Sequence, residues 1–327
     1  MLVSAIITTK NRPLELRTAL DSIVRQTYQK LEIIVVDNGS TPDNSVANKN
    51  LVETIGQKCI YVSLTSDGVR ESGPSRTRNM GIEHAKGELV SFCDDDDYWC
   101  DDMNIESAVA SFSADPSLDF LFANQEAHAN GKLVRKEWLP LLVTRLADRL
   151  PPNGISVRIS RKESLIDDHA HMNTCVFRRD FLLKIGGFWE SVRYLEDLDL
   201  FVRAVDAARH IEYRHQTVSV HNIPNRKLQN NASTQLDILA KYLVEINVAN
   251  HLIQCCHSRD ARQYANRFGS FAYRHLSLAA TKSKHNGAAF SFAKIALILR
   301  PTFKWSAYTL YLGMKSTLAK IRSEKSS

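Results

Sequence analysis

Short apolar runs alternate with a helical pattern in the first forty residues. Residues 3–8 and 31–36 are apolar stretches rich in β-branched side chains, without regular polar alternation. Strands that are covered on both faces have this pattern. Between them, residues 13–28 carry apolar side chains at helical spacing, namely Leu16, Leu20, Ile23 and Val24. The opening therefore predicts a β-α-β unit.

The alternation of predicted strands and helices continues up to about residue 93. We expect a strand over residues 60–64, a helix over residues 75–85, and a strand over residues 89–93 that runs directly into aspartates. Strands that alternate with helices in this way favour a mostly parallel central sheet with helices on both faces. The predicted fold class is therefore α/β.

The second half of the chain changes character. Residues 126–170 are less regular, a strand is expected at residues 173–177, and a helix at the sequence LEDLDL that starts at Leu195. From about residue 234 the pattern is helical, with apolar residues at three- and four-residue steps. We predict a domain at 1–235, with halves 1–115 and 116–235, and a basic α-helical region at 236–327. That region is expected to pack on the domain, with dimerisation as the alternative.

Four consecutive carboxylates, Asp94–Asp97, follow the strand at residues 89–93. Like charges this close oppose one another's ionisation, so a cation is expected at the strand end. Oxygen ligands favour Mg²⁺ or Mn²⁺, which are usually shared with substrate phosphates. The alternative is a solvated acidic turn that caps a helix beginning near Asp101.

Polar residues follow three of the predicted strands, at residues 8–12, 37–40 and 94–97. Ligands of parallel sheets bind outside the carboxyl ends of the strands, so these groups are expected on one rim. The sequence contains neither GxGxxG nor GxxxxGK[ST], and thus neither a dinucleotide fingerprint nor a P-loop.

Two further polar stretches have open interpretations. Residues 167–171, DDHAH, place His169 and His171 on one side of a predicted strand, where a metal site, a substrate contact and plain exposure are alternatives. Glu196 and Asp197 begin a helix, and the helix dipole alone favours acids there.

The charge distribution and the cysteine content indicate a binding partner and a cellular compartment. Residues 257–327 hold 13 Lys and Arg against 2 acids, which leaves 29 bases and 34 acids for residues 1–256. The six cysteines form no CxxC pair, which fits a reducing compartment better than a disulfide or zinc scaffold. The start lacks a basic region and a cleavage site, so we expect a strand there and no signal peptide.

The last stretch, residues 288–314, is too interrupted by charges to span a bilayer. Its basic residues are interleaved with Phe290, Phe292, Phe303, Trp305, Tyr308 and Tyr311. We expect it to lie on an anionic membrane surface, with core packing as the alternative.

These stretches resemble the family 2 glycosyltransferases. The opening VSAIITTKNR is similar to the motif VSVIIPTYNR, and QTYQKLEIIVVDNGS to QTYxxxEIIVVDDGS. GPSRTRNMG matches GxxxARNxG, AKGELVSFCDDDD matches AxGExxxFLDxDD, and the later GGF and EDLDL match GGF…EDxDL. The ordered set covers residues 1–225. Thr9, Lys10 and Asn38 depart from the motifs without removing a necessary chemical group.

The resemblance implies the glycosyltransferase A fold, which is a Rossmann-like nucleotide-diphospho-sugar transferase fold, and sugar transfer with inversion. It assigns the donor to Thr8, Thr9, Asn11, Arg12, Asp37, Arg78, Asp94 and Asp95. Asp94 and Asp96 form the DxD motif, with Asp96 and His221 on the metal. Asp197 is the expected general base and Glu196 the second choice. Acceptor contacts are assigned to His171, Gly187 and Trp189.

The expected activity is metal-assisted, inverting glycosyl transfer from a nucleotide diphosphate sugar, with uridine diphosphate as the implied carrier. The acceptor is a glycan or lipid-linked molecule of bacterial-type surface polysaccharide synthesis, and no nucleic acid partner is expected. The expected location is cytoplasmic, on the inner face of the cell membrane. A sugar nucleotidyltransferase and a catalytically inactive sugar-binding module are the alternatives. The sequence leaves the oligomeric state open.

Overall fold

The computed structural model describes the chain except for residues 65–72, 152–153, 167–168, 224–235 and 325–327. The chain divides into two compact units, Met1–Leu228 and Gln229–Ser327. The acids at residues 167–168 and the predicted boundary at residue 235 lie outside the described residues.

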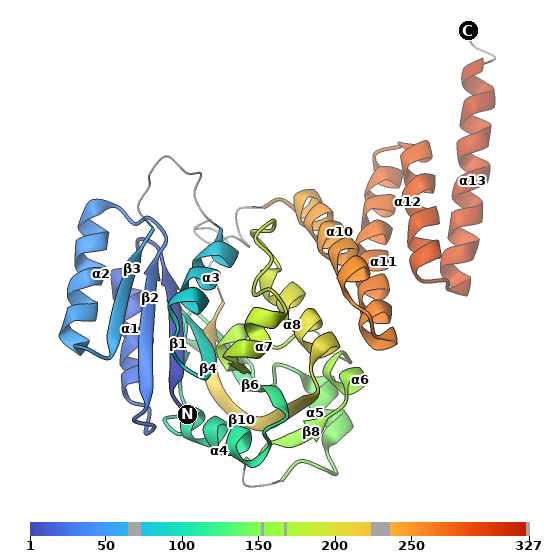
Figure 1. The fold of residues 1–327 in the computed structure, drawn as a ribbon. Coiled ribbons are helices and arrows are strands. Elements are labelled where there is room, and N and C mark those ends of the chain that lie inside the picture. The colour runs from blue at the N-terminus through green and yellow to red at the C-terminus, as the bar shows by residue number, and fades with distance from the viewer. Residues whose placement is uncertain (65–72, 152–153, 167–168, 224–235, 325–327) are drawn as a thin grey trace. The chain divides into compact units, whose positions relative to one another are not determined.

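The first unit is built on one central sheet, shown with its flanking helices in Figure 1. Its strands run in the order β3-β2-β1-β4-β9-β6-β10-β5, with β7 paired to β6 and β8 to β10. The strands are β1 (Val3–Thr9), β2 (Leu31–Asp37), β3 (Cys59–Ser63), β4 (Leu89–Asp94), β5 (Tyr98–Trp99), β6 (Leu118–Ala129), β7 (Lys132–Arg135), β8 (Val157–Ile159), β9 (Cys175–Arg178) and β10 (His210–Asn222).

Parallel pairing holds in two blocks. Strands β3, β2, β1 and β4 are parallel to one another, and β6 is parallel to β10. Strand β9 lies between the blocks and is antiparallel to both β4 and β6. The predicted α/β class, with a central sheet flanked by helices, is confirmed.

Helices cover both faces of the sheet, which explains the absence of polar alternation in the strands. Val3, Ala5 and Ile7 of β1 belong to a core cluster that also contains the apolar sides of α1, α2 and α4. The helices of this unit are α1 (Pro13–Val24), α2 (Pro42–Ile55), α3 (Pro74–His84), α4 (Asn104–Ala114), α5 (Pro140–Leu146), α6 (Arg161–Ser164), η1 (Met172–Thr174), α7 (Arg179–Lys184) and α8 (Glu196–Ala207).

Helix α3 packs closely on the opposite face. A Cβ added to Gly81 would lie 2.4 Å from Cγ2 of Ile6, so glycine permits this approach. Asn79 of the same helix accepts a hydrogen bond from the Phe188 amide at 2.8 Å and donates to its carbonyl at 2.9 Å. The RNxG motif therefore fixes α3 and ties it to the GGF turn.

The predicted strand around the two histidines is wrong. His171 instead caps η1, where its side chain accepts from the Asn173 amide, and β9 begins only at Cys175. The local capping interaction replaces a sheet ladder, so the two histidines are not held on one side of a strand.

The second unit consists, in its described part, of four helices that pack in sequence. The predicted tail segment is divided by the Arg300–Pro301 break into two of them. Trp305 is buried in their common core with Ala289, Ala293, Ala296 and Leu312. No described helix is long and apolar enough to cross a membrane. The helices are α10 (Ile238–Cys255), α11 (Arg259–Lys282), α12 (Asn286–Leu299) and α13 (Phe303–Glu324).

Candidate active site

The parallel register brings the predicted polar residues to one rim. Thr8 pairs with Asp94, and Thr9 pairs with Asp37. The three strand ends of β1, β2 and β4 are therefore adjacent, as parallel pairing requires. Thr9 and Asp37 are buried. The sequence expectation of a shared polar edge agrees with this arrangement.

Asp37 is held by groups from a loop, a helix and a strand. Its carboxylate accepts from the Ser40 amide at 2.8 Å, from Asn48 Nδ2 at 2.8 Å and from the Tyr61 hydroxyl at 2.6 Å. Burial and the bond to Asp37 raise the pKa of Tyr61 to about 12. These donors fix the orientation of the carboxylate, and the motif alone did not indicate Asn48 or Tyr61.

The loops after β1 and β2 are joined through Asn11. Its backbone has a φ of 57°, the left-handed region that asparagine tolerates better than most residues. Its amide donates to Ser40 Oγ at 2.8 Å, and its Oδ1 accepts from the Thr41 amide at 2.7 Å. A strained backbone at a ligand rim is a common feature of binding sites.

Arg12 bridges two carboxylates of the aspartate run. Its Nη1 lies 3.0 Å from both Asp95 Oδ1 and Asp96 Oδ2. Although burial disfavours the charged guanidinium, Asp95 and Asp96 raise the pKa of Arg12. Burial and the adjacent Asp96 raise the pKa of Asp95 to about 7, and Arg12 offsets part of that rise.

A second arginine, Arg78 of α3, joins the aspartate run to α8. It donates to Asp94 at 2.6 Å and to Glu196 at 2.8 Å, and it is nearly buried. Burial opposes its charge, but Asp94 and Glu196 raise the pKa of Arg78. Burial raises the pKa of Glu196, and Arg78 opposes that rise. The two sequence-predicted acid clusters therefore meet through one guanidinium.

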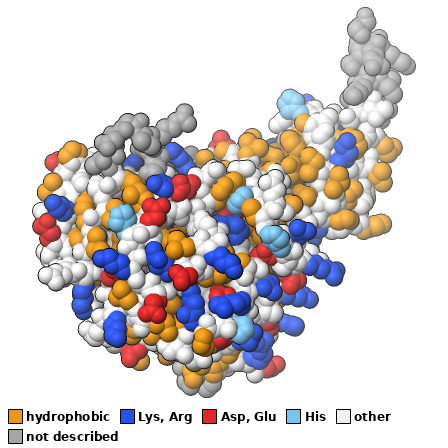
Figure 2. Space-filling model, viewed as in Figure 1, with side chains coloured by type: hydrophobic (Ala, Val, Ile, Leu, Met, Phe, Trp, Pro, Cys, Tyr) orange, Lys and Arg blue, Asp and Glu red, His pale blue; other side chains and the backbone are white. Residues whose placement is uncertain are grey.

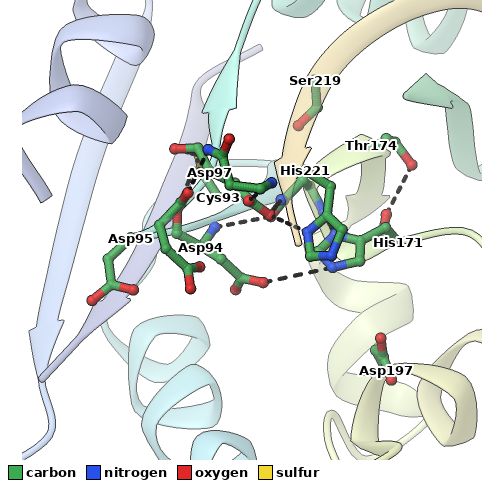
Figure 3. A network of polar contacts seen from close by, with 12 residues as sticks. Cys93, Asp94, Asp95, Asp97, His171, Thr174, Asp197, Ser219 and His221 are labelled. Carbon is green, nitrogen blue, oxygen red and sulfur yellow. Dashed lines mark hydrogen bonds and ion pairs between the residues drawn. The ribbon is translucent and has the colours of Figure 1, made fainter. Parts of the chain in front are cut away.

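The fourth aspartate has a different set of partners (Figure 3). Asp97 accepts from Asn173 Nδ2 at 2.6 Å and from the Asn222 amide at 2.7 Å, and it lies 2.9 Å from His221 Nδ1. The His171 and His221 rings are 4.8 Å apart, and His171 Nε2 lies 3.8 Å from Asp94. These groups come from the end of β4 and the turn after it, from η1 and its cap, and from β10, which are distant in sequence.

Asp97, His171 and His221 fit a metal ion. One ligand atom from each lies within 4.8 Å of the others. Two ligands at about 2.1 Å from one ion are at most about 4.2 Å apart, so shifts of less than an ångström would close the site. Imidazole with carboxylate suits a transition ion such as Mn²⁺ better than Mg²⁺.

Protonation at this cluster differs between its members. Burial lowers the pKa of His171 to about 4 and raises that of Asp97 to about 6. Burial disfavours a charged ring at His221, yet Asp97 raises the pKa of His221. His171 is thus neutral and ready to ligate, whereas Asp97 favours the protonated ring of His221, with which a metal ion would compete.

The predicted ligand Asp96 lies elsewhere in this arrangement, because its carboxylate faces Arg12. His221 belongs to the candidate set and Asp96 does not. The assignment of Asp96 to the metal stays a prediction, and it requires Arg12 to release that carboxylate.

Asp197 stands at the first turn of α8, apart from the metal-ligating groups in Figure 3. It accepts from the Leu198 amide at 2.8 Å and lies 2.8 Å from His169 Nε2. Burial acts to raise the pKa of Asp197, but His169, His171 and the Leu198 amide together outweigh it, and the pKa falls well below its usual range. Leu195 precedes the helix with a φ of 66°, a costly conformation for leucine.

The three predicted acceptor residues have different surroundings. His171 belongs to the candidate metal set, and Trp189 is half-buried. Gly187 is buried, has a φ of 60°, and its carbonyl accepts from Arg203 Nη2 at 2.7 Å. These contacts give Gly187 a role in shaping the turn, and its acceptor contact stays a prediction.

Sequence reasoning missed three supporting residues. Asn173 donates to Asp97 and also accepts from the Asp94 amide at 2.9 Å. Trp138 packs edge-on against His171 and His221 and donates to the His169 carbonyl at 3.0 Å. His169 was flagged only as one of two neighbouring histidines. No local pattern marks these side chains, because each acts on residues far away in the sequence.

Comparison with known proteins places this rim in context. The model of glycosyl transferase family 2 matches residues 4–186. A curated GalNAc(5)-diNAcBac-PP-undecaprenol beta-1,3-glucosyltransferase of Campylobacter jejuni is 35% identical over 95 residues, which is 29% of either protein. The chain spans less than two thirds of the length of the first such relatives.

Two solved structures share the fold. TarS of S. aureus, residues 1–349 in complex with UDP-GlcNAc, matches with a TM-score of 0.63 and 19% identity over 90% of this chain and 82% of that one. The mannosyltransferase PcManGT of Pyrobaculum calidifontis, in complex with GDP-Man and Mn²⁺, matches with a TM-score of 0.59 and 18% identity over 97% and 80%.

Proposed function

The chain belongs to glycosyl transferase family 2, and we propose that it transfers a sugar from a nucleotide diphosphate sugar to an acceptor hydroxyl with inversion. One observation carries the proposal: the ends of β1, β2 and β4 meet at a rim that Arg78 joins to the acids of α8. Such a rim offers an oriented carboxylate, cationic groups and a base within one network.

The nucleotide is proposed to bind at the end of β1 and β2. Asp37 is fixed by three donors, and a fixed carboxylate accepts hydrogen bonds from a pyrimidine N–H or a ribose hydroxyl. Arg12 and Arg78 are the cations nearest the aspartate run and suit a diphosphate. Uridine diphosphate is the proposed carrier, which is consistent with the UDP-GlcNAc bound by TarS.

A divalent cation is proposed at Asp97, His171 and His221, with Asp96 as the ligand predicted from the motif. Such an ion, when bound, neutralises charge on the departing diphosphate. Asn173 and Trp138 keep the ligands in position, and outer partners of this kind raise metal affinity. The Mn²⁺ of PcManGT supports the choice of ion.

Asp197 is the proposed general base. The acceptor oxygen forms a bond to the anomeric carbon as the bond from that carbon to the diphosphate breaks, and the acceptor proton passes to the Asp197 carboxylate. The low pKa of Asp197 keeps it ionised, and its bond to His169 holds its direction. Glu196 is occupied by Arg78, so it is the weaker candidate.

The proposed acceptor is a glycan or a lipid-linked sugar of surface polysaccharide synthesis. The undecaprenol-linked substrate in the name of the Campylobacter jejuni relative supports a lipid-linked class. A cytoplasmic location fits the six cysteines, all of which are free thiols.

The test is a transfer assay with a panel of nucleotide sugars, Mn²⁺ and an undecaprenyl diphosphate-linked sugar. We expect nucleoside diphosphate release that depends on the acceptor, together with a product that is heavier by one sugar. Release of inorganic diphosphate from a sugar 1-phosphate and a nucleoside triphosphate would instead indicate the nucleotidyltransferase reaction and overturn the proposal.

A further inference from the structure

Apolar side chains are strongly exposed where α12 turns into α13. Phe303 is 93% exposed, Ile298 79% and Phe271 of α11 47%. Figure 2 shows hydrophobic side chains gathered on the visible face of the C-terminal helices. Exposed apolar side chains that gather in one patch mark interaction surfaces.

Two arginines lie beside Phe271, and a lysine follows Phe303 in the sequence. The guanidinium carbons of Arg274 and Arg300 each lie 5.7 Å from the ring centre of Phe271. Arg274 Nη2 also donates to the Arg300 carbonyl at 3.1 Å. Lys304 follows Phe303 in the sequence and is exposed. We call these six residues the corner patch: Phe271, Arg274, Ile298, Arg300, Phe303 and Lys304.

The cations of the corner patch have no carboxylate partner among the described residues. Arg274, Arg300 and Lys304 form no ion pair there, and residues 257–327 contain only 2 acids in all. Nε of Arg274 is buried without a hydrogen-bond partner. Burial and the nearby Arg300 lower the pKa of Arg274. An anion beside this pair would relieve the repulsion.

We propose that the corner patch docks on an anionic lipid bilayer. Arg274, Arg300 and Lys304 contact lipid phosphates, while Ile298 and Phe303 enter the boundary of the acyl chains. Basic groups beside apolar side chains are the composition that binds such surfaces. Two copies of the chain joined at this patch would bring like charges together, so charge favours the bilayer over self-association.

The experiment measures sedimentation of the full chain with vesicles of phosphatidylcholine and phosphatidylglycerol, or of phosphatidylcholine alone. We expect binding only to the mixed vesicles. Arg300→Glu with Lys304→Glu should weaken it at least about tenfold, because each basic residue near the surface contributes about fivefold. Ile298→Ser with Phe303→Ser should weaken it comparably. Arg274 is left intact because it packs on Trp305.

Matched controls change the same chemistry elsewhere. Lys30→Glu with Lys58→Glu makes the same charge change at exposed sites of the first unit, and Leu133→Ser with Val134→Ser removes apolar side chains that are 52% and 56% exposed. Circular dichroism confirms that each variant is folded. The proposal requires both control pairs to bind like the wild type.

Three results would overturn the proposal. Equal loss in the lysine control would show general electrostatic attraction without a patch. Binding that survives Ile298→Ser with Phe303→Ser would point to a soluble polyanion. A dimer in sedimentation velocity that this same pair dissociates, with vesicle binding unchanged, would assign the patch to a second copy of the chain.

Discussion

The aspartate run and the corner patch both concentrate charge, but only the aspartate run is compensated from within. Arg12, Arg78 and His221 each face carboxylates of Asp94–Asp97. At the corner patch, Arg274 and Arg300 both lie beside the Phe271 ring. Neither forms an ion pair with an acid among the described residues.

Paired and unpaired charges respond differently to a ligand. At the aspartate run, a ligand must exchange with partners that already hold the carboxylates, so binding a cation or a diphosphate rearranges an existing network. At the corner patch, an anion adds to charges that are unpaired. A buried charge without its partner is costly, whereas an exposed one loses little. Substitutions in the two regions should therefore have very different effects.

The largest effect is expected from Asp197→Asn. Loss of general base catalysis should lower kcat by about 10²–10⁴, while the dissociation constant for the donor stays unchanged because Asp197 contacts His169 and the Leu198 amide rather than the strand ends. Steady-state kinetics and donor titration measure the two quantities. Asp180→Asn, the same change at an exposed site of α7, is the matched control. Full transfer by Asp197→Asn with the native acceptor would refute the base assignment.

The next effect is on stability. Arg78→Met leaves Asp94 and Glu196 buried with no guanidinium between them, so the free energy of unfolding should fall by about 3–5 kcal/mol. Urea denaturation measures it. Adding Glu196→Gln should recover part of the loss, because one of the two stranded charges is then removed. A loss below about 0.5 kcal/mol would mean that the network is not a buried ion pair.

A smaller effect is expected from pH. Asp97 has its pKa raised to about 6 in the folded protein, so the folded state binds its proton more readily than the unfolded state does. In the absence of metal, the contribution of Asp97 to the free energy of unfolding should therefore rise by about 1 kcal/mol as the pH falls from about 7.5 to about 5. Over the same range Asp95, with its raised pKa, acts in the same sense, and His171, with its lowered pKa, acts in the opposite sense. Below about pH 4 the stability contributed by Asp94 and Asp197, whose pKa values are lowered, is lost.

Denaturation across this pH range tests the prediction, and Asp97→Asn is the control. The difference in free energy of unfolding between the wild type and that variant should change by about 1 kcal/mol between about pH 7.5 and about pH 5, because the other groups titrate in both proteins. Saturating Mn²⁺ should reverse this change, since the ion competes with the proton. An equal slope in the wild type and in Asp97→Asn would assign the pH dependence to other groups.

The smallest effect on stability is expected at the corner patch. Arg300→Met should change the free energy of unfolding by less than about 0.5 kcal/mol, because its charge is not paired with an acid. It is the counterpart of Arg78→Met in the same assay. Similar losses in the two variants would contradict the distinction between a compensated and an uncompensated site.

The sequence was sufficient for the rim of the site. Asp37 and Asp94 follow apolar runs, and parallel strands bring such ends together, so local pattern and one rule of sheet geometry place them correctly. The same holds for the α/β class. The antiparallel insertion of β9 was not foreseen, because residues 126–170 have no clear periodicity.

The partners of these residues were harder to predict. Arg12 meets Asp95 and Asp96 more than eighty positions later, and His169 meets Asp197. Such pairs depend on how loops fold over the sheet, and no spacing in the sequence encodes them. His171 was assigned to the acceptor, whereas the structure brings it to Asp97 and His221.

In the C-terminal helices, composition alone does not predict which aromatic side chains are exposed. Its aromatic residues were read as one group facing a membrane, but Trp305 lies in the helical core while Phe303 is exposed. Helical spacing cannot separate the two faces when apolar residues occupy both. Only the packing of α12 against α13 identifies which side chains remain for a partner.

The central claim is that the aspartate run binds a nucleotide diphosphate sugar with the help of a divalent ion. Thermal unfolding with a panel of nucleotide sugars, with Mn²⁺ or with a chelator, tests it most directly. A donor at about 100 times its dissociation constant should add about 2.7 kcal/mol of stability, only with Mn²⁺, and His221→Ala and Asp96→Asn should abolish the gain. The claim is contradicted if no nucleotide sugar stabilises the protein with Mn²⁺, or if the gain is the same with the chelator.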